Sequence, residues 1–398
     1  MSSSSARQKI IPTADKIPAK VMVVTGSSGG HIFPALAFLE KLKEKYSTID
    51  VFLVLPRPFC RVEDILEKRP KGLVNNSVVK RIDNLGYRIK YLPISAIGLN
   101  FSLKNFFAIC NFFKGTLEGL ALFIRFGPDI VVAFGSIICI PVVFFAWIFR
   151  IKTILHEQNV IPGRANRFLA KIADRIAISF SESSSYLSSS VNRLELTGNP
   201  LRQSLKKIDK KAALGFFALS DMKFTVLVTG GSQGSHKINL CFQQAFSGLS
   251  DKEKLQVIHL AGDKDYDLLK ELYKNFNEDI KLFDFLKDMQ YAYSAADLII
   301  TRAGATTISE IILFKLPAII VPYPYAYQHQ LANARILEKR GLAVIIEDRL
   351  LDERRLKDAL EDLLNNRQQL QDMRSGYDRL EVPLAAERLV ESALSLYQ

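Results

Sequence analysis

One stretch of the sequence, residues 297–333, combines a glycine turn with polar side chains that could bind a charged ligand. The apolar run Leu298 to Ile300 predicts a strand, Gly304 ends it, and a helix is expected to begin through Ala305 to Thr307. The first amides of a helix have no partner within it and lie at the positive end of its dipole. An anion such as a phosphate could therefore bind at this turn.

Glu310 is the only acidic residue of this helix, whose other face is apolar. We expect its carboxylate to project near the site and not into a core, where it could accept hydrogen bonds from paired sugar hydroxyls. A strand at 318–321 follows, and parallel strands present their carboxyl ends on one side of a sheet. The polar residues beyond it should return to the same edge: Gln328, His329, Gln330 and Asn333. The pattern predicts a polar pocket there.

His31 is a candidate general base. A short strand, Val21 to Val24, leads into T-G-S-S-G-G-H, in which Ser28, Gly29 and Gly30 precede His31 at the start of a helix. Doubly wound folds bind phosphates with such a turn, although the spacing here is not G-x-G-x-x-G. The dipole of the following helix should lower the pKa of His31 and favour the neutral form of its imidazole.

Further polar residues are expected at the same edge as His31. The strand Thr153 to Leu155 runs into H-E-Q-N, which places His156 to Asn159 at a strand end, where they could line a site or only cap a loop. In the second half, T-G-G-S-Q-G-S-H repeats the strand, glycine loop and helix plan, and it offers donors from Ser232 to Gly234. Two such halves predict two Rossmann-like, doubly wound α/β domains that face each other across a cleft.

The length of 398 residues also suits two domains. We place a flexible leader at 1–19, an N-terminal domain at 20–198, a C-terminal domain at 199–380 and a final helix at 381–398 that crosses back to the N-terminal domain. The leader is polar and has no apolar segment typical of a signal peptide. The stiff turn Gly198-Asn199-Pro200 marks the expected linker.

The net charge of +12 lies entirely in the first half of the chain. Residues 1–200 hold 26 Lys and Arg against 14 Asp and Glu, which leaves 27 of each for residues 201–398. The first half is therefore expected to meet something anionic. A phospholipid surface, a pyrophosphate substrate and nucleic acid all satisfy this requirement.

Two apolar segments could either be buried in a protein core or contact a membrane. Residues 96–126 hold more aromatic and leucine side chains than one buried face requires, with Lys104 and Lys114 among them; we favour a core, with a bilayer interface as the alternative. Residues 130–149 contain 20 uncharged residues, long enough to span a membrane, but Gly135, Ser136 and Pro141 interrupt them. There we predict a strand, a turn and a core helix.

Other common chemistries lack their motifs. No Asp or Asn cluster suggests a metal site, and there is neither a P-loop, a serine nucleophile elbow nor an NAD fingerprint. The four cysteines, three of them among apolar neighbours, are far apart in the sequence, and we interpret them as reduced core residues.

Six motifs in their order, T-G-S-S-G-G-H, L-H-E-Q-N-V-I-P-G-R-A-N, G-N-P-L-R, G-G-S-Q-G-S, T-R-A-G-A-T-T-I-S-E and H-Q-x-x-N-A, resemble the MurG family of glycosyltransferase family 28. The likeness covers about residues 20–395. It implies a GT-B fold and an inverting transfer of N-acetylglucosamine from UDP-N-acetylglucosamine to the 4-hydroxyl of the N-acetylmuramoyl unit of lipid I (undecaprenyl-pyrophosphoryl-N-acetylmuramoyl-pentapeptide), which forms lipid II. It also implies a peripheral location at the cytoplasmic face of the bacterial plasma (inner) membrane, with an anionic membrane surface as partner and no nucleic acid.

The resemblance also implies roles for individual residues. His31 would be the base, with Ser28, Gly29, Gly30 and Asn159 in the acceptor side of the cleft. Arg202 and Ser232 would meet the diphosphate or sugar, the backbone of Leu286 the uracil, and Glu310 the ribose hydroxyls. The phosphates would lie on Ala305, Thr306, Thr307, Ile308 and Ser309, and the glucosamine hydroxyls on His329 and Gln330, supported by Asn333. No cofactor and no metal would be required.

Two other functions remain open at the level of sequence. Another GT-B enzyme, such as a glycolipid transferase or a UDP-sugar epimerase, would use the same donor site. A non-catalytic basic protein that binds membrane or nucleic acid would explain the net charge of +12 but not the six motifs.

Overall fold

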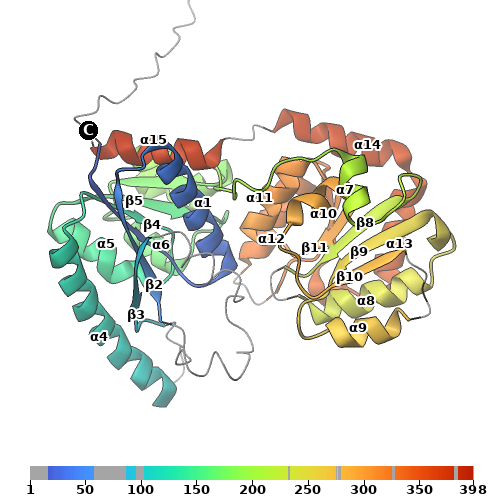
Figure 1. The fold of residues 1–398 in the computed structure, drawn as a ribbon, viewed down its shortest axis with the longest axis horizontal. Helices are drawn as coiled ribbons and strands as arrows, with labels where there is room; N and C mark the ends of the chain where they lie inside the picture. Colours follow the sequence, from blue (N-terminus) through green and yellow to red (C-terminus); the bar gives the residue numbers. More distant parts are fainter. Residues whose placement is uncertain are drawn as a thin grey trace, which may run out of the picture.

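The computed structural model describes residues 17–57, 87–95, 103–231, 234–274, 276, 279–324, 328–380 and 384–397, without the side chain of residue 104. Two parallel sheets, each covered by helices on both faces, lie side by side along the long axis of the molecule (Figure 1). The predicted fold class, two Rossmann-like doubly wound α/β domains, is confirmed.

The first sheet has seven strands in the order β3-β2-β1-β4-β5-β6-β7, all parallel. Its elements are β1 (Lys20–Val24), α1 (Gly29–Lys45), β2 (Asp50–Pro56), β3 (Arg88–Leu92), α4 (Leu103–Phe126), β4 (Ile130–Ala133), α5 (Cys139–Ile148), β5 (Lys152–Glu157), α6 (Arg164–Leu169), β6 (Arg175–Ile178), the 3₁₀ turns η2 (Ser181–Tyr186) and η3 (Ser188–Arg193), and β7 (Leu194–Leu196).

The second sheet has six parallel strands in the order β10-β9-β8-β11-β12-β13. The elements of this domain are α7 (Lys210–Phe216), β8 (Phe224–Thr229), α8 (His236–Ser247), η4 (Lys252–Lys254), β9 (Leu255–Leu260), α9 (Tyr266–Leu272), β10 (Ile280–Phe283), α10 (Met289–Ala295), β11 (Leu298–Thr301), α11 (Ala305–Phe314), β12 (Ala318–Ile320), α12 (His329–Glu338), β13 (Ala343–Ile345), η5 (Asp348–Leu350), α13 (Glu353–Asn365), α14 (Arg367–Gly376) and η6 (Tyr377–Arg379). The described chain ends with α15 (Ala385–Tyr397).

The central strands β1, β4, β8 and β11 are mostly apolar because both faces of each sheet are covered there. In β1, Val21 and Val23 pack into one core layer, while Met22 and Val24 pack into the layer on the other face. Side chains alternate between faces with a period of two, so a single run of valines serves both layers. The second sheet is built in the same way, with separate core layers on its two faces.

The last helix, α15, returns from the second domain to the first (Figure 1). Leu389, Val390, Ala393 and Leu394 of α15 are buried in the same core layer as α1 and β1. Lys41 of α1 forms an ion pair with Glu387 at 2.7 Å. The domain boundaries at 19/20, 198/199 and 380/381 stay predictions, and most of the expected leader lies outside the described residues.

The apolar helix α4 covers the outside of the first sheet beside α5 (Figure 1), but the expectation that it serves only a core is wrong. Phe123 and Phe126 are buried, whereas Phe106, Phe113, Leu117 and Ile124 are each more than 60% exposed. Their spacing of 7, 4 and 7 residues places them on one side of the helix, away from the core. We call these four residues the α4 stripe.

Among the described helices, only the Asn105–Phe126 part of α4 is long and apolar enough to cross a membrane, a criterion of length and composition that surface and core helices also satisfy. Its inner side packs on the domain through Phe123 and Phe126. Residues 130–149 form β4, a turn and α5, as predicted.

The cysteine prediction is only partly right. Cys139 is buried, Cys241 is half-buried and Cys110 is exposed on α4, while Cys60 lies outside the described residues. The apolar neighbours of Cys110 in sequence belong to the exposed side of α4, which explains the error.

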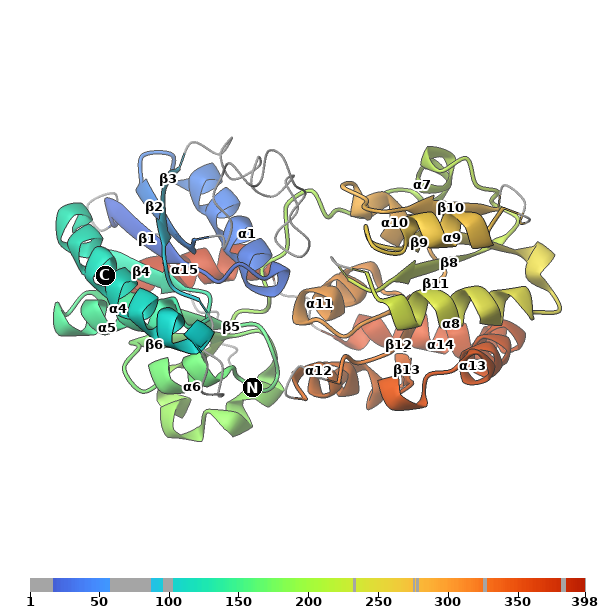
Figure 2. The same ribbon diagram turned by 90° about the horizontal axis from the view of Figure 1, so that it is seen from below.

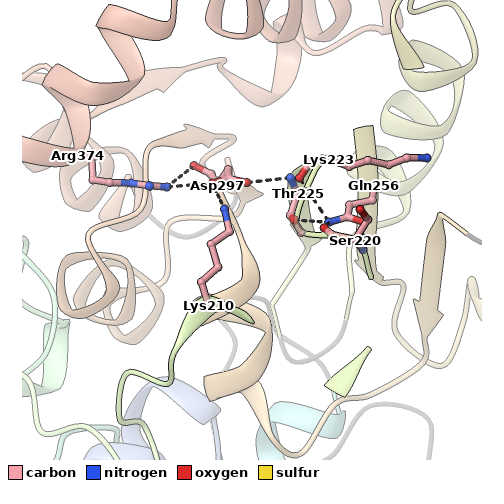
Figure 3. A network of polar contacts seen from close by, with 7 residues as sticks. All are labelled: Lys210, Ser220, Lys223, Thr225, Gln256, Asp297 and Arg374. Carbon is pink, nitrogen blue, oxygen red and sulfur yellow. Dashed lines mark hydrogen bonds and ion pairs between the residues drawn. The ribbon is translucent and has the colours of Figure 1, made fainter. Parts of the chain in front are cut away.

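Asp297 lies at the amino-terminal edge of the second sheet, where it connects the sheet to two helices (Figure 3). Its carboxylate accepts a hydrogen bond from the backbone amide of Thr225, at 3.0 Å, and pairs with Lys210 of α7 at 2.5 Å and Arg374 of α14 at 3.4 Å. Next to it, the buried amide of Gln256 donates to the Ser220 carbonyl and the Thr225 hydroxyl. This edge faces away from the cleft, so the network has a structural role.

We predict that Asp297→Ala lowers the free energy of unfolding by about 1–3 kcal/mol, because it leaves the Thr225 amide and two cations without their shared acceptor. Urea unfolding followed by circular dichroism measures the change. Asp251→Ala is the control, because among the described residues the Asp251 carboxylate pairs with Lys254 alone, at an exposed site, and we expect a change below about 0.5 kcal/mol there. Equal effects of the two substitutions would contradict the role of Asp297.

Candidate active site

Each sheet has one point where the strand order reverses, between β1 and β4 in the first and between β8 and β11 in the second. Loops that leave the strands in opposite directions open a crevice at such a point, and doubly wound folds bind their ligands there. The carboxyl edges of the two sheets face each other, with α11 and α12 on the side of the second domain nearest the first (Figure 2). Helices α1 and α11 are in contact across this boundary.

His31 lies in the first turn of α1, at the crevice of the first sheet. Its ring sits between two glycines: a Cβ atom on Gly26 would lie 3.1 Å from His31 Cδ2, and one on Gly135 would lie 3.2 Å from Cε1. The Nδ1 atom is 2.9 Å from Oε1 of Gln158. Glycine at both positions therefore lets the backbone approach the imidazole closely, and Gly135 also has a φ of +88° that favours glycine.

Burial is the main cause that lowers the pKa of His31 below its usual value of 6.5, and hydrogen bonds with Gln158 and the Phe134 carbonyl oppose it. The pKa of His31 is lowered, as the sequence predicts. The main cause is desolvation of the imidazolium, however, and not the helix dipole that the sequence suggested. A neutral imidazole near pH 7 is the form that can accept a proton.

The H-E-Q-N residues lie deeper than the sequence indicated, because β5 continues to Glu157. His156 and Glu157 are fully buried strand residues, and the Glu157 carboxylate caps the loop that follows. Both oxygens of Glu157 accept hydrogen bonds, Oε1 from the Asn159 amide at 2.8 Å and Oε2 from Asn166 at 2.7 Å. Glu157 thus shapes the loop at 159–163, and burial raises its pKa.

The anion site predicted at the first turn of α11 stays a prediction, and one unpaired hydroxyl there is consistent with it. Thr306 Oγ1 is a buried hydroxyl with no hydrogen-bond partner in the described structure, which points to a ligand that supplies one. Two of the residues predicted to bind the phosphates have polar groups that already form hydrogen bonds within the helix. The Ile308 amide donates to the Gly304 carbonyl within the helix, and the Ser309 hydroxyl donates to the Ala305 carbonyl.

Glu310 is more buried than the sequence pattern suggested, with only 8% of its surface exposed. Its Oε2 accepts a hydrogen bond of 2.7 Å from the Tyr293 hydroxyl. Burial raises the pKa of Glu310, while the nearby Arg202 guanidinium and the Tyr293 hydroxyl lower it. Arg202, from the linker after the first domain, also stacks on the Phe33 ring of α1 at 4.9 Å, so it lies between the two domains.

Asn333 and His329 of α12 bind the first domain directly. Asn333 is fully buried; its Oδ1 accepts from the Val160 amide at 3.0 Å and its Nδ2 donates to Asn159 Oδ1 at 3.1 Å. His329 Nδ1 donates to the Ile161 carbonyl at 2.7 Å. The loop at 159–161 therefore joins the two domains, and Asn333 has little hydrogen-bonding capacity left for a ligand.

Gln330 connects two loops at the carboxyl edge of the second sheet. Its Oε1 accepts from the Ala303 amide at 3.0 Å and from the Tyr323 amide at 2.9 Å. Both lone pairs of this oxygen are used, so Gln330 can only donate to a ligand, through Nε2.

The remaining candidates differ in position. Ser28 is the exposed N-cap of α1, and Gly29 and Gly30 follow it in the first turn. Leu286 is 9% exposed and packs in the core of the second domain, which leaves its backbone as its polar contribution. Ser232 and Gln233 lie outside the described residues.

Sequence reasoning missed Arg302, which is nearly buried at the crevice of the second sheet. Its guanidinium donates to Ser235 Oγ at 2.8 Å and pairs with Asp348 at 2.5 Å, so it joins the loop after β11 to the start of α8. The signal was present as the arginine of T-R-A-G, directly before the glycine turn. Tyr293 could not have been found, because nothing in the helix sequence shows that its hydroxyl meets Glu310.

Two doubly wound domains with opposed carboxyl edges, a histidine in one crevice and a helix amino terminus in the other define a GT-B glycosyltransferase architecture. The N-terminal domain of glycosyltransferase family 28 matches residues 73–178, and its C-terminal domain matches residues 225–389.

Named relatives agree. A UDP-N-acetylglucosamine–N-acetylmuramyl-(pentapeptide) pyrophosphoryl-undecaprenol N-acetylglucosamine transferase of Thermodesulfovibrio yellowstonii is 34% identical over 95% of this chain and 98% of its own. The transferase of the same name from Listeria monocytogenes is 31% identical over 95% of this chain and 99% of its own. The chain therefore belongs to this family of transferases, the MurG family within glycosyltransferase family 28.

Solved structures support the fold. Acinetobacter baumannii MurG superimposes with a TM-score of 0.71 at 23% identity, over 94% of this chain and 99% of that one. A UDP-GlcNAc 2-epimerase from Neisseria meningitidis, bound to UDP-GlcNAc, gives 0.65 at 15% identity over 94% of this chain and 100% of that one. At these identities the likeness concerns the fold alone.

We predict that the protein loses stability as the pH falls below about 6.5. Burial lowers the pKa of His156 to about 4 and of His259 to about 3, so the unfolded chain binds more protons in this range. Through each of these two histidines, the free energy of unfolding should fall by about 1 kcal/mol for each pH unit between pH 6 and pH 4.5. Unfolding midpoints across this range measure the slope, and His259→Gln should make it shallower; an unchanged slope in that variant would contradict the assignment.

Proposed function

We propose that this chain transfers N-acetylglucosamine from UDP-N-acetylglucosamine to the 4-hydroxyl of the N-acetylmuramoyl unit of lipid I, forming lipid II. The observation that carries the proposal is the pairing of a half-buried histidine of lowered pKa at one crevice with a helix amino terminus at the facing one, in a chain that matches a transferase of this name over 98% of its length. The transfer joins two substrates in the cleft between the domains.

The chemistry follows from these two groups. His31 takes the proton of the acceptor hydroxyl, and that oxygen attacks the anomeric carbon from the face opposite UDP, with inversion. The amino terminus of α11 and the Thr306 hydroxyl stabilise the negative charge that develops on the leaving diphosphate. These groups supply a base and a stabilised leaving group without a covalent intermediate.

The donor site extends over the second domain. Glu310 accepts hydrogen bonds from the ribose hydroxyls, and Arg202 meets the diphosphate or sugar, since both lie at the boundary between α11 and α1. Gln330 donates to the sugar hydroxyls through Nε2, and His329 lies beside it at the start of α12. Asn333 supports this helix through its contacts with residues 159 and 160.

The first domain carries the acceptor and meets an anionic membrane surface from the cytoplasmic side. Its α4 stripe offers apolar side chains to the lipid, and Lys114, Arg125 and Arg150 are exposed close by in sequence. Apolar side chains bordered by cations are suited to a bilayer interface with anionic headgroups. The whole net charge of +12 lies in the half of the chain that contains this surface, and nucleic acid is not required to explain it.

We expect His31→Ala to lower kcat for lipid II formation by about 10²- to 10⁴-fold, the usual contribution of a general base, while UDP binding stays within about twofold. Radiolabelled UDP-N-acetylglucosamine with lipid I measures turnover, and calorimetry measures UDP binding. An equally active variant would place the base elsewhere.

The same assay separates this function from that of an epimerase, because GT-B-like neighbours include UDP-N-acetylglucosamine 2-epimerases. An epimerase would convert the UDP-sugar in the absence of lipid I. We expect the wild-type protein to release UDP only when lipid I is present, and acceptor-independent conversion of the sugar nucleotide would overturn the proposal.

A second expectation concerns the membrane surface. The double substitution Phe113→Ser/Leu117→Ser removes two exposed apolar side chains, each worth about 1.5–3 kcal/mol when fully buried, so binding to vesicles of phosphatidylglycerol should weaken by at least about 10-fold. Vesicle sedimentation measures it, with Met222→Ser in the second domain as the matched exposed control. Unchanged vesicle binding of the double variant would remove the α4 stripe from the interface.

A further inference from the structure

The side chain of Gln158 lies between two buried or half-buried histidines and two backbone carbonyls. Its Nε2 is 3.0 Å from the Phe134 carbonyl oxygen and 3.3 Å from that of His156. A carbonyl oxygen can only accept, so the amide group that faces these two atoms must be the NH₂ group. The orientation of the amide is thereby fixed, and its Oε1 must face His31.

This orientation determines which nitrogen of each histidine carries a proton. Oε1 of Gln158 can only accept, so His31 Nδ1, at 2.9 Å, must be the donor. The NH₂ group also faces His156 Nδ1 at 3.1 Å, and because an amide nitrogen does not accept, Nδ1 must be an acceptor. His156 then carries its proton on Nε2 and donates it to the Gly198 carbonyl at 3.0 Å.

The other nitrogen of His31 is left for chemistry. With its proton on Nδ1, the neutral imidazole can donate only from that nitrogen, to Gln158 Oε1 and the nearby Phe134 carbonyl, and the His31 side chain as a whole is half-buried. The adjacent ring carbons lie against Gly26 and Gly135, which hold the ring in its plane. A neutral imidazole with hydrogen on Nδ1 has its basic lone pair on Nε2.

We propose that Gln158 is a positioning residue for the transfer, whose amide fixes His31 as the Nδ1–H tautomer and so presents the Nε2 lone pair to the acceptor hydroxyl. In the reaction the hydroxyl proton moves to Nε2, the electrons of its O–H bond form the new bond to the anomeric carbon, and the bond from that carbon to the diphosphate oxygen breaks with its electrons on UDP. The inference rests on the proposed function only for this step. The tautomer itself is a property of the free protein.

The hydrogen bonds from His31 through Gln158 and His156 also reach the linker between the domains. Gly198, which ends the chain of hydrogen bonds, has a φ of +82° and precedes the segment that leads to Arg202. His156 and Gln158 are each no more than 1% exposed, so water does not compete for these hydrogen bonds. The tautomer is therefore set by the backbone geometry at Phe134 and Gly198.

The first test is the tautomer of the wild-type protein. The chain has five histidines, so ¹⁵N-histidine labelling gives a spectrum that can be assigned with a His31→Gln variant. We expect His31 protonated on Nδ1 and His156 on Nε2 at pH 7.5. An Nε2–H tautomer at His31 would overturn the proposal whatever reaction the protein catalyses, while the expected tautomer in a protein that makes no lipid II would leave the geometry intact and reject the function.

The second test is Gln158→Met, which keeps the length of the side chain and removes the amide. We expect kcat to fall about 10- to 100-fold, the scale of a lost orienting group, with the KM for UDP-N-acetylglucosamine within about twofold and with His31 present as a mixture of tautomers. The matched control is Gln256→Met, which removes a buried amide with four hydrogen bonds at the far edge of the second sheet (Figure 3). It should lose stability but keep kcat.

A Gln158→Met protein with wild-type kcat, or a Gln256→Met protein with an equal loss of kcat, would overturn the proposal. If Gln158→Met does not fold, the wild-type tautomer spectrum decides alone, because it requires no variant at position 158.

Discussion

Parallel strands bring all their carboxyl ends to one edge, and in this protein two such edges face each other across a boundary that Asn333 spans. Its buried amide binds the loop at 159–161 of the first domain and the Ala303 carbonyl of the second. An unpaired buried amide is costly, so these contacts hold α12 and the loop in register. This register places His31 of the first domain and the amino terminus of α11 on facing sides of the boundary.

Desolvation acts on both sides of that space. Burial lowers the pKa of His31 and raises the pKa of Glu310, which moves both groups toward their neutral forms. On the Glu310 side the Arg202 guanidinium opposes this effect, and the Tyr293 hydroxyl gives the carboxylate a donor. Burial thus favours the neutral form of the His31 imidazole, while the Arg202 guanidinium favours the ionised form of the Glu310 carboxylate.

The two domains divide the work according to their surfaces. The first domain has the net charge, the exposed α4 stripe and the base, whereas the second, with 27 cationic and 27 anionic residues from residue 201 onward, has the helix terminus that suits a nucleotide diphosphate. A membrane-bound acceptor and a dissolved donor would approach from these different sides. Helix α15 returns to pack against α1, so both ends of the described chain contribute to the first domain.

Much of the fold could be predicted from the sequence, since buried parallel strands are continuous apolar runs and glycine turns mark where they end. The strand predicted at Val21 to Val24 and the helix start predicted at Ala305 agree with β1 and α11, and the membrane interpretation of 130–149 was rightly rejected because a glycine, a serine and a proline interrupt it. The α4 stripe was misjudged, because composition counts apolar side chains but does not say which of them find a partner in the core.

The site shows the same division. The sequence by itself determined the residue types that carry the chemistry: a histidine after a double glycine, a threonine-rich helix start and a lone glutamate on an apolar helix. Only the tertiary structure decided their states, because burial, the Tyr293 hydroxyl beside Glu310 and the Gln158 amide beside His31 come from elements far apart in the chain. A proton's place on one imidazole nitrogen depends on the atom facing the other, and only the packed fold brings that atom there.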